Sequence, residues 1–204
     1  MIDVDNFRRG VKASLHRVIH VDPTTLLRLT RFPSTEPYWG KNKAYRFDDP
    51  KQMFGVTYAA RKIEVAFAET VLHESGAFYD NAWMIREAKM RERYVIRYVR
   101  PVGDLRVLDL TGMAGKRLGL NNDISAYGDY AVPMAVARVL YEETDLDGIC
   151  YVSRQCNTDY AYAIFERSGL SAKSGAAPLM AHPHYLDLLD YFNVELLPDT
   201  LPPA

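Results

Sequence analysis

Cysteine is scarce in this chain of 204 residues, which contains only Cys150 and Cys156 and no CxxC pair. Two such cysteines provide neither a disulfide framework nor a thiolate zinc site. They are typical of a protein from a reducing compartment. We therefore expect a cytoplasmic location.

Long apolar runs and an excess of one charge are also lacking. No segment approaches the roughly 20 apolar residues of a membrane-spanning helix, and residues 1–20 carry scattered charges instead of the apolar stretch of a signal peptide. The 25 basic and 26 acidic residues nearly cancel. The overall field therefore favours neither nucleic acid nor a membrane surface. We expect a soluble protein with no direct nucleic-acid binding and no membrane association.

Several motifs that identify a chemistry are missing. No GxGxxG follows a strand and no GxxxxGK[ST] is present, which argues against a Rossmann or P-loop phosphate site. His182 and His184 form an HxH without an acidic or cysteine partner at metal spacing, so we expect no metal site. Ser153 lies in Tyr-Val-Ser-Arg-Gln rather than in GxSxG, which argues against an α/β-hydrolase triad.

The composition that remains is that of a globular protein. Hydrophobic residues make up 48% and charged residues 25% of the chain, both ordinary values. A length of 204 residues fits one domain, 1–204, with a sizeable core. The 14 tyrosines suit a pocket for planar ligands.

Hydrophobic periodicity predicts a mixture of strands and helices without regular βαβ alternation. This pattern predicts an α+β fold, with a central mixed or antiparallel β-sheet flanked by helices. We expect an amphipathic N-terminal lead-in that is helical around 11–20, and a poorly ordered tail after the last helix. The segment 160–165 fits a strand or a helix equally well. The predicted strands are 26–30, 54–59, 92–99, 105–110 and 147–153, and the predicted helices are 61–73, 130–143 and 184–191.

The stretch 54–73 combines a strand with a helix that is apolar on two sides. Tyr58 shares a strand face with Phe54 and Val56. Glu69 and His73 lie on the narrow polar strip between the two apolar sides of the helix. We therefore expect Glu69 at the edge of a core, where a carboxylate costs free energy unless it is paired or used.

Two arginines precede or lead into this stretch. Arg28 is embedded in the predicted strand 26–30, and Arg46 ends a long connection, 31–46, that contains adjacent aromatic residues. A connection of that length in a compact domain is usually functional or disordered, and the aromatic pair favours function. We expect Arg28 to be held by its strand neighbours and Arg46 to be ordered by a ligand.

Each candidate residue also has a structural interpretation. The arginines can form salt bridges, Tyr58 can pack, Ser153 can cap a turn, and Glu69 can pair with His73 four residues later. The residues alone leave both interpretations open. The candidates are Arg28, Arg46, Tyr58, Glu69, His73 and Ser153.

Five segments, taken in order and spacing, resemble the RES domain, which is named for the arginine, glutamate and serine that its members share. They are Leu26-Leu-Arg28, Tyr45-Arg46-Phe47, Phe54-Gly-Val-Thr-Tyr58-Ala, Ala66-Phe-Ala-Glu69-Thr70 and Gly148-Ile-Cys-Tyr-Val-Ser153. The resemblance covers about residues 25–170. RES proteins are best known as toxins of bacterial RES–Xre toxin–antitoxin pairs, resemble ADP-ribosyltransferase toxins in fold, and act on NAD⁺.

The resemblance implies a role for each candidate, with NAD⁺ as a substrate and no cofactor. Catalysis would fall to Glu69, which stabilises an oxocarbenium-like ribose, and to Arg28 and Arg46, which grip the pyrophosphate. Tyr58 would stack on the nicotinamide ring. Ser153 would hydrogen-bond the amide or ribose, and His73 would orient Glu69.

Alternatives stay open at the level of residues, activity and partners. Arg31 competes with Arg28, and Glu64 competes with Glu69, although Glu64 has a sufficient role at the start of its helix. The expected activity is an NAD⁺-consuming toxin, either a glycohydrolase or a phosphorylase. The alternatives are a mono-ADP-ribosyltransferase and an inert partner-binding module. The expected partner is an Xre-like antitoxin or immunity protein, and a homo-oligomer is an open alternative.

Overall fold

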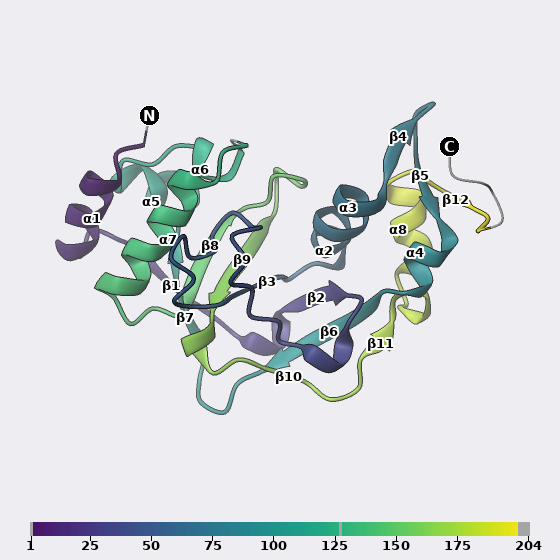
Figure 1. Cartoon of the computed structure of the whole chain (residues 1–204), viewed down its shortest axis with the longest axis horizontal. Coiled ribbons are helices and arrows are strands. Elements are labelled where there is room, and N and C mark those ends of the chain that lie inside the picture. Colours follow the sequence, from purple (N-terminus) through teal and green to yellow (C-terminus); the bar gives the residue numbers. More distant parts are fainter. Residues whose placement is uncertain (1, 127, 200–204) are drawn as a thin grey trace.

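A mixed β-sheet crosses the molecule (Figure 1). The computed structural model describes residues 2–126 and 128–199. In these residues β7 and β8 run parallel, and the other neighbouring strands of the sheet run antiparallel. The nine strands are, in spatial order, β1 (Val18–Val21), β7 (Leu105–Asp109), β8 (Gly148–Val152), β9 (Tyr160–Phe165), β3 (Val56–Ala60), β2 (Leu27–Thr30), β6 (Tyr94–Val99) and β10 (Ser171–Ala172), with β11 (Ala177–Pro178) also paired to β6.

Helices gather at two ends of this sheet (Figure 1). One group packs beside β8 and contains α1 (Val4–Lys12), α5 (Gly112–Arg117), α6 (Asp123–Ala126) and α7 (Ala131–Glu143). The other group packs beside β2 and β3 and contains the continuous helix α2 (Ile63–Phe67), η3 (Ala68–Leu72) and α3 (His73–Ser75), followed later by α8 (Tyr185–Tyr191). Short 3₁₀ turns are η1 (Pro23–Thr25), η2 (Pro33–Thr35), η4 (Glu166–Ser168) and η5 (Leu179–Ala181).

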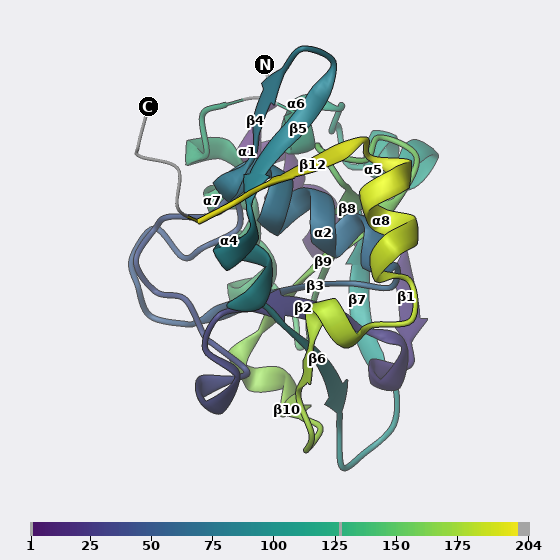
Figure 2. The same ribbon diagram turned by 90° about the vertical axis from the view of Figure 1, so that its right-hand side faces the viewer.

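A small second sheet extends from the α2 side of the molecule. It consists of β12 (Val194–Leu197), β5 (Ala82–Arg86) and β4 (Ala77–Tyr79), and α4 (Glu87–Arg91) follows it. Figure 2 shows β4 and β5 as a projecting hairpin that β12 crosses at its base. All three residues of β4 are exposed. This part of the segment 74–91 therefore shows no alternation of buried and exposed residues from which a strand could be predicted.

Alternation along the strands divides the core between the two faces of the central sheet. Leu29, Val56 and Ile149 belong to the larger apolar cluster, which includes the buried faces of α1, α2 and α7. Ile96 and Cys150 belong to a smaller cluster. The larger cluster is therefore built on the helix-bearing face, with the middle strands lying between the two helix groups.

The predicted α+β architecture is confirmed, including all five predicted strands and the three helices of the central and C-terminal parts. The undecided segment 160–165 is strand β9. No helix among the described residues is long and apolar enough to cross a bilayer.

The prediction of a helix around 11–20 is wrong. The helix is α1, Val4–Lys12, because the side chain of Asp3 caps its N-terminus by accepting hydrogen bonds from the N–H groups of Asp5 and Asn6. The run Val18–Val21 instead forms the edge strand β1, paired with β7. Its β-branched residues favour a strand.

The expectation of a poorly ordered tail is also wrong for 194–197. These residues form β12, which pairs in parallel with β5. The paired residues are more than 100 positions apart in the chain, so no local sequence pattern predicts the pairing. The remainder of the predicted tail, 200–204, lies outside the described residues.

Gly148 at the start of β8 allows a close approach of two strands. A Cβ at this position would clash with the Ala163 carbonyl and lie 2.9 Å from the Cα of Ile164. We predict that Gly148→Ala lowers the free energy of unfolding by about 1–3 kcal/mol. Gly128→Ala is the control, because a Cβ there meets nothing within 4 Å. Chemical denaturation measures both, and equal stability of the two variants would contradict the assigned packing.

Candidate active site

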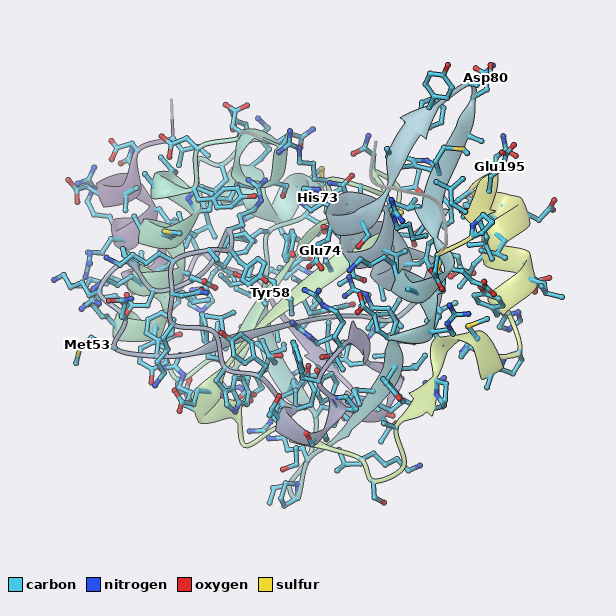
Figure 3. All side chains as sticks on the ribbon, turned by 45° about the vertical axis from the view of Figure 1, so that its right-hand side comes forward. Met53, Tyr58, His73, Glu74, Asp80 and Glu195 are labelled. Carbon is cyan, nitrogen blue, oxygen red and sulfur yellow. The ribbon has the colours of Figure 1, made fainter. Side chains whose placement is uncertain are left out.

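A cavity of about 500 Å³ opens against the middle strands. Its wall combines residues of β2, β3, β8 and β9 with the helix 63–75 and the loop that ends at Arg46. In Figure 3, Tyr58, His73 and Glu74 lie near one another at the centre of the molecule, whereas Met53 and Asp80 lie at its extremities. Five of the six predicted candidates line this cavity: Arg28, Arg46, Tyr58, Glu69 and His73.

The helix that carries Glu69 contains a π-helical turn, η3. The N–H of His73 donates to the carbonyl of Ala68, five residues earlier. Such turns are rare and recur at functional sites because they insert one extra residue into a helix. The turn lies where Glu69 and Thr70 reach the cavity wall, between the buried residues Ala68 and Val71.

Glu69 is held by Ser153. The hydroxyl of Ser153 donates to Glu69 Oε1 over 2.6 Å, and the hydroxyl oxygen of Ser153 accepts the N–H of Cys156 over 3.0 Å. Ser153 is fully buried behind the cavity wall. This geometry makes Ser153 a positioning residue for the carboxylate, which differs from the direct ligand contact implied by the resemblance.

Glu64, the rival carboxylate, does not line the cavity. It occupies the first turn of α2, where a negative charge suits the helix dipole. The position of Glu69 favours it as the carboxylate that meets a ligand.

His73 lines the cavity but does not orient Glu69. Its side chain is exposed, and within the described part of the chain it forms no hydrogen bond or ion pair. The extra residue of the π turn displaces His73 from the position that it would occupy one α-helical turn after Glu69. The predicted pair is therefore replaced by the contact of Glu69 with Ser153.

Arg28 occupies a place where the sheet splits. Among the described residues, β2 and β3 pair only at Leu27 and Ala60, and Arg28 Nη1 donates to the Tyr58 carbonyl over 3.1 Å. Its Nε lies 3.2 Å from Glu36 Oε1, and the Glu36 side chain is only 1% exposed. The expectation that its surroundings hold Arg28 is confirmed.

Arg31, the rival of Arg28, follows the end of β2. It also lines the cavity, but its side chain is 43% exposed and reaches only 4.0 Å from Glu92. An exposed pair of this kind fixes a side chain weakly. Arg28 is the better-ordered of the two.

The Arg46 side chain is buried and held by contacts within the chain, and the expectation that a ligand orders it stays a prediction. Arg46 is 8% exposed, its Nη1 lies 3.4 Å from the Ile124 carbonyl oxygen, and its guanidinium carbon lies 4.8 Å from the centre of the Tyr130 ring. Burial lowers the pKa of Arg46, but a guanidinium stays charged at neutral pH.

The residues just after Arg46 explain why this part of the loop has a fixed position. Phe47, Asp48 and Asp49 are all fully buried, and Arg138 Nη1 lies 3.0 Å from Asp49 Oδ1. The loop that ends at Arg46 is thereby anchored to α7. This contact could not be predicted from a local sequence pattern, because Asp49 and Arg138 are 89 positions apart.

Tyr58 lines the cavity, and its hydroxyl is engaged elsewhere. The hydroxyl donates to Asp48 Oδ1 over 3.0 Å and accepts the N–H of Phe47 over 2.9 Å. Burial, and after it the charge of Asp48, raise the pKa of Tyr58 well above its usual value. The residue therefore contributes a neutral aromatic face.

The cavity lining also includes residues that were not predicted, among them Tyr130, Tyr151 and Arg154. Tyr151 is two residues before Ser153, so the two-residue period of β8 directs both to one face and could have identified it. Burial, and after it the charge of Glu69, raise the pKa of Tyr151. Tyr130 begins the predicted helix 130–143 and Arg154 follows the predicted strand 147–153, and no local pattern places either residue at the cavity.

Metal chemistry receives no support from the arrangement of ligands. Among residues 2–126 and 128–199, no group of three or more His, Cys, Asp or Glu side chains is placed to hold a metal ion. The two cysteines are free.

Comparison with known proteins links this geometry to a family. The family model described as the RES domain matches residues 17–185, a longer span than the five segments suggested. A chain of the crystal structure of the M. tuberculosis MbcT–MbcA toxin–antitoxin complex superposes with a TM-score of 0.64 at 18% identity, covering 91% of this chain and 98% of that chain. At this identity the likeness shows the fold. No curated protein matches the chain.

Proposed function

The chain belongs to the RES domain family, and from this premise we propose that it cleaves the nicotinamide–ribose bond of NAD⁺. Water or phosphate would accept the ADP-ribosyl group. The observation that carries the proposal is a glutamate fixed at the wall of a cavity that also presents arginines and tyrosine rings. A cavity of about 500 Å³ is within the usual range for ligand pockets.

Glu69 supplies the negative charge that the reaction needs. As the nicotinamide leaves with the bonding electrons, positive charge develops on the ribose, and a fixed carboxylate stabilises it. The Ser153 hydroxyl holds one oxygen of Glu69, which leaves the other oxygen for the ribose. A carboxylate positioned in advance costs little reorganisation during the reaction.

Arg28 and Arg46 supply positive charge for the pyrophosphate. The formal net charge of the protein is −1, so long-range attraction for a dianion is weak and the cavity must provide it locally. Contacts within the chain hold both arginines. A guanidinium suits phosphate oxygens because it donates two parallel hydrogen bonds.

Tyrosine rings supply the surface for the planar nicotinamide. Tyr58 and Tyr151 line the same cavity as Glu69. Because the Tyr58 hydroxyl is already bonded to Asp48, the residue would contact the ligand through its ring face.

A biological role as a toxin is supported by the family and by the solved structure that this chain resembles. The solved neighbour is described as a toxin–antitoxin complex. As a toxin, this chain would consume NAD⁺ until an Xre-like antitoxin or immunity protein binds it.

Purified protein incubated with NAD⁺ tests the activity directly. Nicotinamide release with and without added phosphate separates hydrolysis from phosphorolysis. Transfer of labelled ADP-ribose to proteins of a lysate, without free ADP-ribose, would indicate the mono-ADP-ribosyltransferase instead. No reaction in either assay would support the inert partner-binding module.

Glu69→Gln should lower the turnover of NAD⁺ by about 10²-fold or more while keeping the fold, because it removes the charge that stabilises the ribosyl cation. Steady-state kinetics of nicotinamide release measures this loss. Glu64→Gln is the matched control and should be nearly neutral. Equal losses in the two variants would contradict the role of Glu69.

Arg28→Ala and Arg46→Ala should each weaken kcat/KM for NAD⁺ by about 1.5–3 kcal/mol, the usual contribution of a charge-assisted hydrogen bond. Similar losses are expected because the structure orders both side chains. Arg28→Lys should retain more activity than Arg28→Ala but less than the wild type, because an ammonium group cannot donate two parallel hydrogen bonds as the planar guanidinium does.

Arg31→Ala is the control for the arginine assignment and should retain activity, since Arg31 is exposed. Loss of activity in Arg31→Ala with full activity in Arg28→Ala would show that the wrong arginine has been chosen.

Expression in a bacterial cell should arrest growth and deplete NAD⁺, whereas Glu69→Gln should do neither. Plating efficiency and extracted NAD⁺ measured over the same hour check both parts. Growth arrest at unchanged NAD⁺ would point to protein modification or to another target.

A further inference from the structure

A buried carboxylate lies behind the cavity wall. Asp48 is fully buried, with 0% of its surface exposed. Within the described residues it forms no ion pair. Burying a charge without a cationic partner is costly, because water no longer solvates it. Arg28 pairs with Glu36 and Asp49 pairs with Arg138. Asp48 has no such close pair, although the charge of Arg28 also opposes the rise that burial causes in the pKa of Asp48.

The contacts of Asp48 lead into the cavity wall. Its Oδ1 accepts the Tyr58 hydroxyl over 3.0 Å, and its Oδ2 accepts the Tyr45 N–H over 3.1 Å. Both partners line the cavity, and their rings lie 5.5 Å apart. Burial raises the pKa of Asp48, while these two hydrogen bonds oppose the rise by stabilising the carboxylate.

A carboxylate bonded to a phenol changes what the ring offers. As the Tyr58 hydroxyl shares its proton with Asp48, electron density shifts toward the oxygen and the ring, and the negative ring face becomes stronger. The N–H of Phe47 donates to the same hydroxyl over 2.9 Å and fixes its direction. Such a face attracts cations, and the attraction is strongest where water is excluded.

The nicotinamide ring of NAD⁺ is a cation, whereas the ring of NADH is neutral. We infer that Asp48, acting through the ring of Tyr58, is a specificity-determining residue that selects the cationic nicotinamide of NAD⁺ over the neutral ring of NADH. This inference rests on the proposed function and adds the form of the dinucleotide that the cavity accepts. Asp48 itself touches no ligand and acts through Tyr58.

Measurements with three ligands distinguish a role of Asp48 in selecting NAD⁺ from a purely structural role. The measurements are KM for NAD⁺, the inhibition constant of NADH, and the inhibition constant of ADP-ribose, which lacks the nicotinamide ring. Asp48→Asn removes the charge and keeps an oxygen acceptor for the Tyr58 hydroxyl. It should raise KM for NAD⁺ about three- to tenfold, the range of a cation–π contact, and change the other two constants less than about twofold.

Tyr58→Phe is the second variant, because it keeps the ring and removes the hydroxyl bond to Asp48. It should shift the preference in the same direction, and it carries the test if Asp48→Asn does not fold. Asp147→Asn is the matched control. Asp147 is a buried carboxylate that lies 3.0 Å from Arg100 and away from the cavity, so its loss should lower stability and leave all three constants unchanged.

Two results would overturn the inference. An unchanged ratio of the NAD⁺ and NADH constants in Asp48→Asn and Tyr58→Phe would overturn the inference. Equal weakening of all three ligands would also overturn it, by showing that Asp48 only supports the loop 44–49. If the wild-type protein releases no nicotinamide, the proposed function fails separately. Calorimetric titration with NAD⁺ and NADH then still decides the inference.

Discussion

Two contacts of Tyr58 support the cavity from opposite sides. Its carbonyl accepts a hydrogen bond from Arg28 where β2 splits from β3, and its hydroxyl bonds to Asp48 in the loop that carries Arg46. One residue of β3 thereby ties together both arginine-bearing segments. Glu69 reaches the same cavity from the π turn of the neighbouring helix. The arrangement of these charged groups depends on this strand, because Tyr58 contacts both Arg28 and Asp48.

Buried acids fix the charged groups of the cavity. Glu36 lies beside Arg28, and Asp49 binds Arg138 and so anchors the chain just after Arg46. Ser153 plays the equivalent part for Glu69. Arg28, Arg46 and Glu69 are therefore each held by a neighbouring part of the chain, which would reduce the entropy that a bound ligand must remove.

Local patterns in the sequence predicted much of this structure. The two-residue period in 54–59 identified strand β3, and the buried apolar run in 147–153 identified strand β8. The two apolar stripes of 61–73 identified the helix that carries Glu69. The π turn was not predictable, because one inserted residue leaves the apolar pattern almost unchanged. The order of Arg46 and the pairing of β12 with β5 depend on contacts between residues far apart in the chain, which no local period records.

The central claim is that Glu69 and its surroundings break one particular bond of NAD⁺. The most direct measurement is mass spectrometry of all products formed from NAD⁺ by the purified protein. The account predicts one nicotinamide for each NAD⁺ consumed, together with ADP-ribose or its 1″-phosphate, with the pyrophosphate intact. Nicotinamide mononucleotide together with AMP would show cleavage at the pyrophosphate and would contradict it.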